Sequence, residues 1–276
     1  MLGKMIKHEF KATGRLYLPL FLITLVLTPV LGLLFKFSGG IGEGSFFGTI
    51  VSGMSMTGYV IMLIALCIAS FIYVIVRFYK TVATSEAYLT FCLPVKPTDI
   101  LTSKLVVGVI WELLSVGVML LSIFVMLTIQ GSDIPQKAFD VLGKIAPILA
   151  TEYGSVAFFF IHMGLIILIA SIAGTLAFFL SICLGQLFNE HRVIMSIAMY
   201  VGVYTVSQIL SVVVFMPFLL SDPKAMIVGK VSAGDVDFAG IPTLGFFLSV
   251  GALQLALGAV YFIVCRVIMK KKMNVR

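Results

Sequence analysis

Six long apolar stretches with almost no charge constrain this chain more than any other feature of its sequence. They cover residues 16–35, 52–76, 105–129, 157–184, 193–219 and 243–267. About 20 apolar helical residues cross the roughly 30 Å of hydrocarbon in a bilayer, and every stretch reaches that length. Apart from Glu112 and Arg266, which lie near span ends, none contains an acidic residue, Lys or Arg. The pattern predicts an all-α integral membrane protein with six transmembrane helices, forming a single transmembrane domain over residues 1–276.

Composition excludes a water-soluble fold. The chain is 61% hydrophobic and 11% charged, whereas soluble domains average about 25% charged residues. So much apolar surface would remain exposed in water and aggregate. The first stretch is too long for the apolar region of a signal peptide and no small-x-small cleavage pattern follows it, so we expect it to remain as the first span.

The distribution of Lys and Arg predicts the orientation of the chain. Cytoplasmic loops of membrane proteins are enriched in these residues. With the N-terminus inside, fourteen of the 19 basic residues are cytoplasmic, and five are outside: Lys36, Lys137, Lys144, Lys224 and Lys230. Both termini are therefore expected in the cytoplasm. The net charge of +7 indicates contact with membrane lipids, and we expect no nucleic-acid partner.

The first 15 residues have an amphipathic pattern. Leu2, Met5, Ile6 and Phe10 share one helical face, and cations surround the other, at Lys4, Lys7 and Lys11. A helix with such a pattern lies in the membrane interface. We therefore expect residues 1–15 to form an interfacial helix before the first span.

The predicted cytoplasmic loop at residues 77–104 has signals for a short helix of its own. Thr84 or Ser85 can cap a helix whose first turn contains Glu86, and Leu93 precedes Pro94. Between these signals, a helix over residues 86–93 would present apolar side chains near the cytoplasm. Two interpretations remain open: the helix rests on the membrane and has no partner, or it docks a soluble protein.

Two stretches resemble a known family. The opening MLGKMIKHEFKATGR and the loop RFYKTVATSEAYLTFCLPVKPTDILTSKL, about 45 residues together, are similar to permease subunits of type-2 ATP-binding-cassette exporters from a group common in Gram-positive bacteria. The resemblance implies a six-span subunit in the bacterial cell membrane. It also implies a dimer with a second permease, identical or related, and a coupling helix that sits in a cleft of a separate cytoplasmic ATPase.

The same resemblance implies where coupling takes place. The residues that would contact the ATPase are Glu86, Tyr88, Leu89, Phe91 and Leu93. ATP and Mg would be bound by the partner, and this chain would bind no cofactor and catalyse no reaction. The sequence agrees, because it contains no G-x-x-x-x-G-K-[ST] phosphate loop. The glycine-rich stretch 38–45 lacks the required Lys and is predicted to lie outside.

Few residues in the spans suggest other chemistry. Three histidines and four scattered cysteines make no convincing catalytic or metal-binding set. An ion-coupled transporter would need ionisable groups at mid-membrane, and only Glu112 and His162 qualify. For Glu112, beside Trp111, the alternatives are a structural ion pair with Arg15 or Arg77 and a role in gating.

The fifth span has one polar face. Its members are spaced by three and four residues, at Tyr200, Tyr204, Ser207, Gln208 and Ser211. This face either packs within the subunit or borders a translocation path at a dimer interface, where Tyr204, Gln208 and Ser211 would meet an amphipathic or hydrophobic substrate such as a peptide, lipid or drug. Ala170, Gly174 and Ala177 predict a separate close-packing face on the fourth span. The alternative function is that of an ion-coupled or structural six-span protein without an ATPase.

Overall fold

The computed structural model describes residues 2–40, 46–83, 97–131, 143, 146–147, 149–150, 153–188, 192–221, 230–232, 235–237 and 244–271. Its helices are α1 (Leu2–Gly40), α2 (Phe46–Ala83), α4 (Pro97–Ile129), α6 (Val156–Gly185), α7 (Arg192–Ser221) and α8 (Leu244–Lys271). A short antiparallel pair, β1 (Lys230–Ser232) and β2 (Asp235–Asp237), precedes α8, and Val231 pairs with Val236.

The six predicted spans are confirmed as helices of the described residues. All six are long and apolar enough to cross a membrane, which makes the chain a multi-pass membrane protein. Several helices exceed the length that the bilayer requires. Helix α2, for example, has 38 residues and measures about 57 Å at 1.5 Å per residue, against roughly 30 Å of hydrocarbon.

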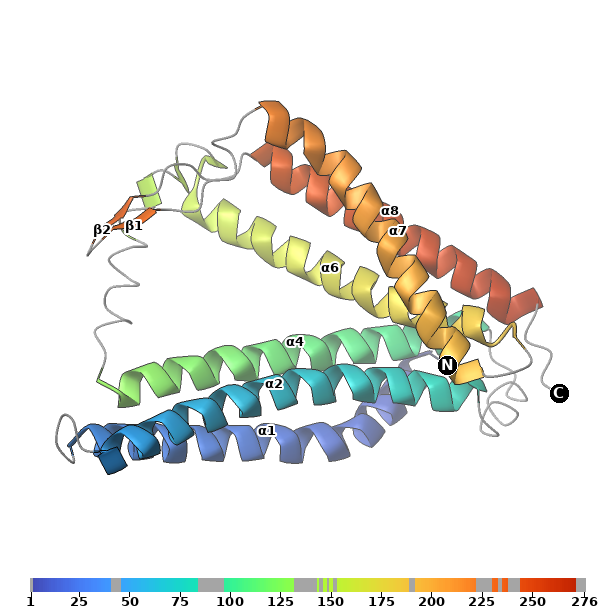
Figure 1. The fold of residues 1–276 in the computed structure, drawn as a ribbon. Helices are drawn as coiled ribbons and strands as arrows, with labels where there is room; N and C mark the ends of the chain where they lie inside the picture. Colours follow the sequence, from blue (N-terminus) through green and yellow to red (C-terminus); the bar gives the residue numbers. More distant parts are fainter. Residues whose placement is uncertain are drawn as a thin grey trace. The chain divides into compact units, whose positions relative to one another are not determined.

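The predicted separate N-terminal helix is not confirmed, because α1 is one continuous helix from Leu2 to Gly40. Its first turns nevertheless run at an angle to the remainder (Figure 1). Pro19 lies inside α1, so the Arg15 carbonyl group loses its helical N–H donor and the proline ring crowds it. The bend follows from that proline, and the chain changes direction without leaving the helical conformation.

Contacts divide the chain into two compact units. Unit 1 comprises Met1–Arg77 and Val106–Phe139, and unit 2 comprises Phe78–Leu105 and Asp140–Arg276. The boundaries fall inside α2 and α4, so each of these helices contributes to both units.

An aromatic cluster forms the core of unit 1. Tyr17 and Phe21 of α1 pack with Leu66 of α2 and with Trp111 of α4. The rings of Tyr17 and Trp111 stack with centroids 4.8 Å apart. Farther along, Gly32 allows α1 to lie close to α4, because a methyl group there would stand 3.2 Å from Ile129. Helices α1 and α4 are thus in contact at both positions.

Helix α6 is the centre of unit 2 and packs against both α7 and α8. Phe179 of α6 stacks on Phe78, in the last turns of α2, with centroids 3.9 Å apart. Near the end of α6, Cys183 is fully buried against Cys265 of α8.

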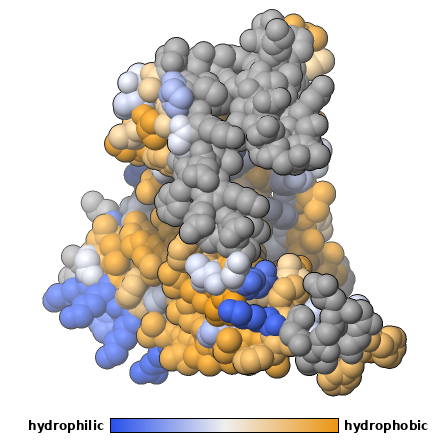
Figure 2. Space-filling model, turned by 90° about the vertical axis from the view of Figure 1, so that its left-hand side faces the viewer, coloured by the Kyte–Doolittle hydropathy of each residue, from blue (hydrophilic) through white to orange (hydrophobic). Residues whose placement is uncertain are grey.

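Large apolar side chains are widely exposed on the helices, for example Leu18, Ile61, Ile161 and Val213. Most of the coloured surface in Figure 2 is accordingly hydrophobic. A soluble protein exposes far smaller apolar patches, so this surface is suited to lipid.

Candidate functional site

Hydroxyl groups inside unit 1 are joined across its three helices. Tyr17 Oη donates to the carbonyl group of Ser70 (2.9 Å), and Ser70 Oγ donates to Ser115 Oγ (2.9 Å). Ser115 in turn donates to the carbonyl group of Trp111 (2.8 Å). These groups satisfy each other inside the unit, as polar groups in a bilayer must.

A second set lies farther along the same helices. Ser122 of α4 hydrogen-bonds Thr28 of α1 (2.7 Å) and Tyr59 of α2 (3.2 Å). Thr28 also donates to the Thr24 carbonyl group (2.7 Å). Since Ser122 and Thr28 are almost fully buried, both sets hold the helices of unit 1 together and neither offers a polar surface to a ligand.

Glu112 is half-buried on α4, and its carboxyl group interacts electrostatically with the Tyr17 hydroxyl group. Of the two arginines predicted as its partners, Arg77 forms an ion pair with Glu9, with 2.9 Å between Arg77 Nε and Glu9 Oε2. This pair fastens the first turns of α1 to α2. The gating role and the structural ion pair of Glu112 both stay predictions.

The polar face of α7 is only partly used within unit 2. Tyr200 stacks on Phe178 of α6, with centroids 4.5 Å apart, and Ser207 is within hydrogen-bonding reach of Tyr261 on α8. The next positions around the helix are open: Tyr204 is 51% exposed, Gln208 is exposed and Ser211 is half-buried. One edge of the face therefore packs inside the unit, and the other edge has no cover among the described residues.

Helix α7 differs from the other spans in its packing. In its most apolar stretch of 18 residues, none of the residues is buried, whereas 39% of the corresponding stretch of α6 is buried. A span that packs so little within its own unit has faces available for lipid or for another protein. Tyr204 and Gln208 are poor lipid-facing residues, since polar side chains in membranes seek hydrogen-bonding partners.

The five predicted coupling residues, Glu86, Tyr88, Leu89, Phe91 and Leu93, lie outside the described residues. The helix ends that flank them are described. Val82 of α2 and Ile100 and Leu101 of α4 are buried, and all three belong to unit 2. The loop is thus attached on both sides to packed helix ends, which continue as α2 and α4 into unit 1.

Three features escaped the sequence analysis. Cys183 and Cys265 have their Sγ atoms 3.2 Å apart, as free thiols, although 82 residues separate them in the chain. The His162 imidazole stacks on Phe158, and its Nε2 is enclosed without a partner among the described residues. Trp111 Nε1 is enclosed in the same way. No sequence spacing signals the thiol pair, because its members meet only when α6 packs on α8.

Within the described ranges, no three His, Cys, Asp or Glu side chains gather where they could hold a metal ion. In the comparisons with known proteins, the chain matches no protein family, no curated protein and no solved structure.

Proposed function

We propose that this chain is the membrane-spanning subunit of an ATP-driven exporter of the ATP-binding-cassette type. It would work as a dimer, with an identical or related second permease, and would move an amphipathic or hydrophobic substrate outward. ATP would be hydrolysed with Mg in a separate cytoplasmic ATPase. The observation that carries the proposal is the polar face of α7, which its own unit leaves open at Tyr204 and Gln208.

The open face of α7 supports both a dimer and a path. Polar side chains that face lipid are unfavourable, and a second permease packed on this face would cover them. Between two such faces, the hydroxyl of Tyr204 and the amide of Gln208 could hydrogen-bond the polar part of an amphipathic substrate while the surrounding apolar residues contact its hydrophobic part.

The packing of the loop ends supports coupling through α2 and α4. A partner that pushes on residues 86–93 acts on two helix ends that are buried in unit 2. Because α2 and α4 are continuous helices, displacement of these ends moves the rest of each helix in unit 1 as well. Both units would therefore respond to one docking event.

The alternative is an ion-coupled or structural membrane protein without an ATPase. Ion coupling needs ionisable groups in the membrane, and Glu112 and His162 are the acidic and imidazole candidates in the predicted spans. Glu112 lies beside Trp111 near the predicted cytoplasmic end of its span, which suits a headgroup-level position better than a mid-membrane relay.

The test is purification of the tagged chain from its native membranes and measurement of the ATPase activity that accompanies it. In the triple variant Tyr88→Ala/Leu89→Ala/Phe91→Ala, this activity should fall by roughly tenfold or more, because each aromatic anchor of an interface is commonly worth about 2 kcal/mol. The protein should still insert into the membrane.

The matched control is Phe46→Ala/Phe47→Ala, which removes two exposed aromatic side chains at the opposite end of α2 and should retain the activity. The proposal fails if the wild-type chain carries no ATPase, or if the purified chain alone moves solute in liposomes under an ion gradient.

A further inference from the structure

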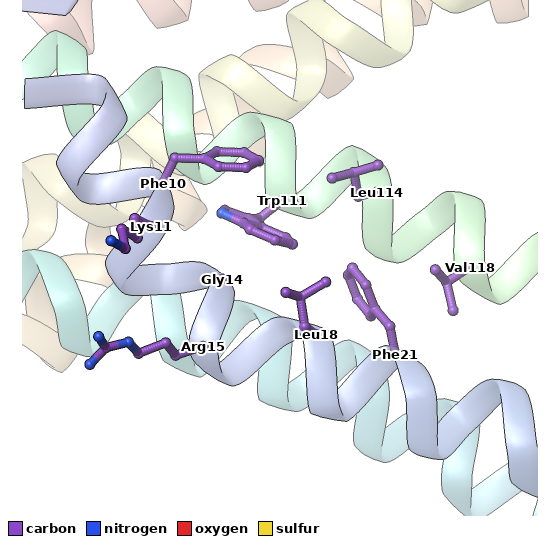
Figure 3. Close-up of a pocket in the computed structure, with 9 residues that line it drawn as sticks. All are labelled: Phe10, Lys11, Gly14, Arg15, Leu18, Phe21, Trp111, Leu114 and Val118. Carbon is purple, nitrogen blue, oxygen red and sulfur yellow. The ribbon is translucent and has the colours of Figure 1, made fainter. Parts of the chain in front are cut away.

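A groove runs along unit 1 between α1 and α4, with a volume of about 590 Å³. Ligand pockets commonly measure about 300–1,000 Å³. Figure 3 shows its two ends: Lys11 and Arg15 lie at one, and Phe21 and Val118 at the other. The groove is charged at one end and apolar along the rest.

The charged end carries two cations on neighbouring turns of α1. Lys11 and Arg15 are exposed and stand four residues apart, on one face of the helix. Neither forms an ion pair with another residue that the structure describes. Like charges at this spacing destabilise a helix, so an anion bound between them would remove an unfavourable interaction and add two favourable ones.

Trp111 forms the floor beside the cations. It is 3% exposed and stacks on Phe10 and on Tyr17, each at 4.8 Å. Gly14 allows α1 to lie against the indole, since a methyl group there would stand 3.4 Å from Trp111 Cζ2. The indole Nε1 has no partner among the described residues, and in Figure 3 it is on the side of the ring that faces Lys11.

An enclosed N–H without an acceptor is unfavourable. Any oxygen-bearing anion held by Lys11 and Arg15 would bring an acceptor near that N–H. Exposed side chains such as Lys11 change rotamer freely, and Lys11 and Trp111 line the same groove. The anion site and the unsatisfied donor therefore point to the same end of the groove.

The remainder of the groove suits a hydrocarbon chain. Leu18 and Phe21 of α1 face Leu114 and Val118 of α4 along it. Residues 11–15 precede the first predicted span, and Phe21 lies five residues, about 8 Å, inside it. The groove thus extends from headgroup level to about half the depth of one leaflet, whose hydrocarbon is about 15 Å thick.

We propose that this groove binds one anionic phospholipid of the leaflet that surrounds the N-terminal end of α1. Its phosphate lies between Lys11 and Arg15 and accepts a hydrogen bond from Trp111 Nε1, and one acyl chain follows Leu18, Phe21, Leu114 and Val118. The site requires that the chain reside in a membrane, and it is independent of an ATPase partner.

Trp111 makes the site directly measurable, because it is the one tryptophan of the 276-residue sequence. The purified full chain is titrated in detergent micelles with phosphatidylglycerol or phosphatidylcholine whose acyl chains are brominated, since bromine quenches indole fluorescence on contact. Half-maximal quenching should occur at a phosphatidylglycerol fraction about fivefold or more below that of phosphatidylcholine, as expected for basic residues that attract anionic lipid.

In Lys11→Gln/Arg15→Gln, both lipids should quench at the same fraction. Lys4→Gln/Lys7→Gln removes the same charge from exposed positions of α1 outside the groove and should keep the preference, as should the charge-conserving Lys11→Arg/Arg15→Lys. An unchanged emission maximum before lipid is added verifies that each variant is folded.

The proposal is overturned if wild-type protein responds equally to the two lipids, or if Lys4→Gln/Lys7→Gln loses the preference as completely as the groove variant. It is also overturned if inorganic phosphate reverses the quenching, because the site would then recognise the free anion and no lipid.

Discussion

Gly185, the last residue of α6, lies directly against Ser196 in the second turn of α7. A methyl group added at Gly185 would stand 2.6 Å from the Cα atom and 2.7 Å from the backbone nitrogen of Ser196. Backbone atoms cannot rotate away as a flexible side chain can, so the helices would have to separate. The absence of a side chain at this position sets how closely α6 and α7 approach.

We expect Gly185→Ala to destabilise the protein by about 1–3 kcal/mol, the usual consequence of overpacking, and to lower the melting temperature in detergent by several degrees. The control is Gly174→Ala in the middle of α6, where an added methyl group meets nothing within 4 Å. That variant should be neutral or slightly more stable, because Ala favours the helix over Gly. Equal melting temperatures for the two variants would contradict the close contact.

Of the predicted close-packing face Ala170, Gly174 and Ala177, Gly174 has no close neighbour among the described residues, since a methyl group there would meet nothing within 4 Å. A methyl group at Gly258 of α8, in contrast, would lie 3.6 Å from the Cβ atom of Ala173. Small residues occur on several faces of α6, so their spacing in the sequence does not show which face packs. The packing face is set by where α7 and α8 contact α6.

At the scale of elements, α7 is the described helix with the fewest buried residues in its most apolar stretch. Tyr200 stacks on Phe178 and holds α7 against α6, yet no residue in the most apolar stretch of α7 is buried. The hydroxyl groups of Thr205 and Ser211 donate to backbone carbonyl groups one turn earlier in α7. Their hydrogen atoms therefore need no acceptor outside the helix. Tyr204 and Gln208 are the polar side chains that a second permease would cover.

If the second permease is an identical copy, this argument predicts that Gln208→Cys cross-links to that copy in native membranes. Cys67 and Cys92 are replaced by Ala beforehand, and a short bifunctional maleimide should give a product of twice the monomer mass. Val206→Cys is the control, since Val206 is 57% exposed at the same depth but on the opposite face of α7. Strong cross-linking of Val206→Cys, with none at Gln208→Cys, would place the interface elsewhere.

At the scale of the whole molecule, the described residues contain six helices that are long and apolar enough to cross a membrane, so we predict an even number of crossings. An even number returns the chain to the side on which it began. Phe46, at the start of α2, and Lys270, near the end of α8, are then expected on opposite sides. The bias of Lys and Arg assigns Lys270 to the cytoplasm.

Labelling intact cells with a membrane-impermeant maleimide tests this topology. Phe46 is 83% exposed and Lys270 is exposed, so a cysteine at either position is accessible from its own side. In a background without Cys67 and Cys92, Phe46→Cys should react in intact cells and Lys270→Cys only after the membrane is opened. Reaction of Lys270→Cys in intact cells would reverse the orientation or change the number of crossings.

Sequence alone determined the number of spans, their approximate limits and an expected orientation. These properties follow from exclusion of charge from hydrocarbon, which acts on each stretch separately and needs no knowledge of its neighbours. The N-terminal helix was harder, because amphipathic residues 1–15 and an apolar span can share one continuous helix. Pro19 is the residue of the sequence that accounts for the bend within it.

The tertiary structure alone decided which polar and small residues face the interior. Tyr200 and Tyr204 look equivalent on one helical face, yet the first stacks on α6 and the second is exposed. Cys183 and Cys265 look unrelated, yet their sulfur atoms touch. A span that is apolar on all sides carries no periodic signal for its buried face. Which side chains become buried therefore depends on which helices pack together. That packing joins residues far apart in the chain, so no single stretch of sequence predicts it.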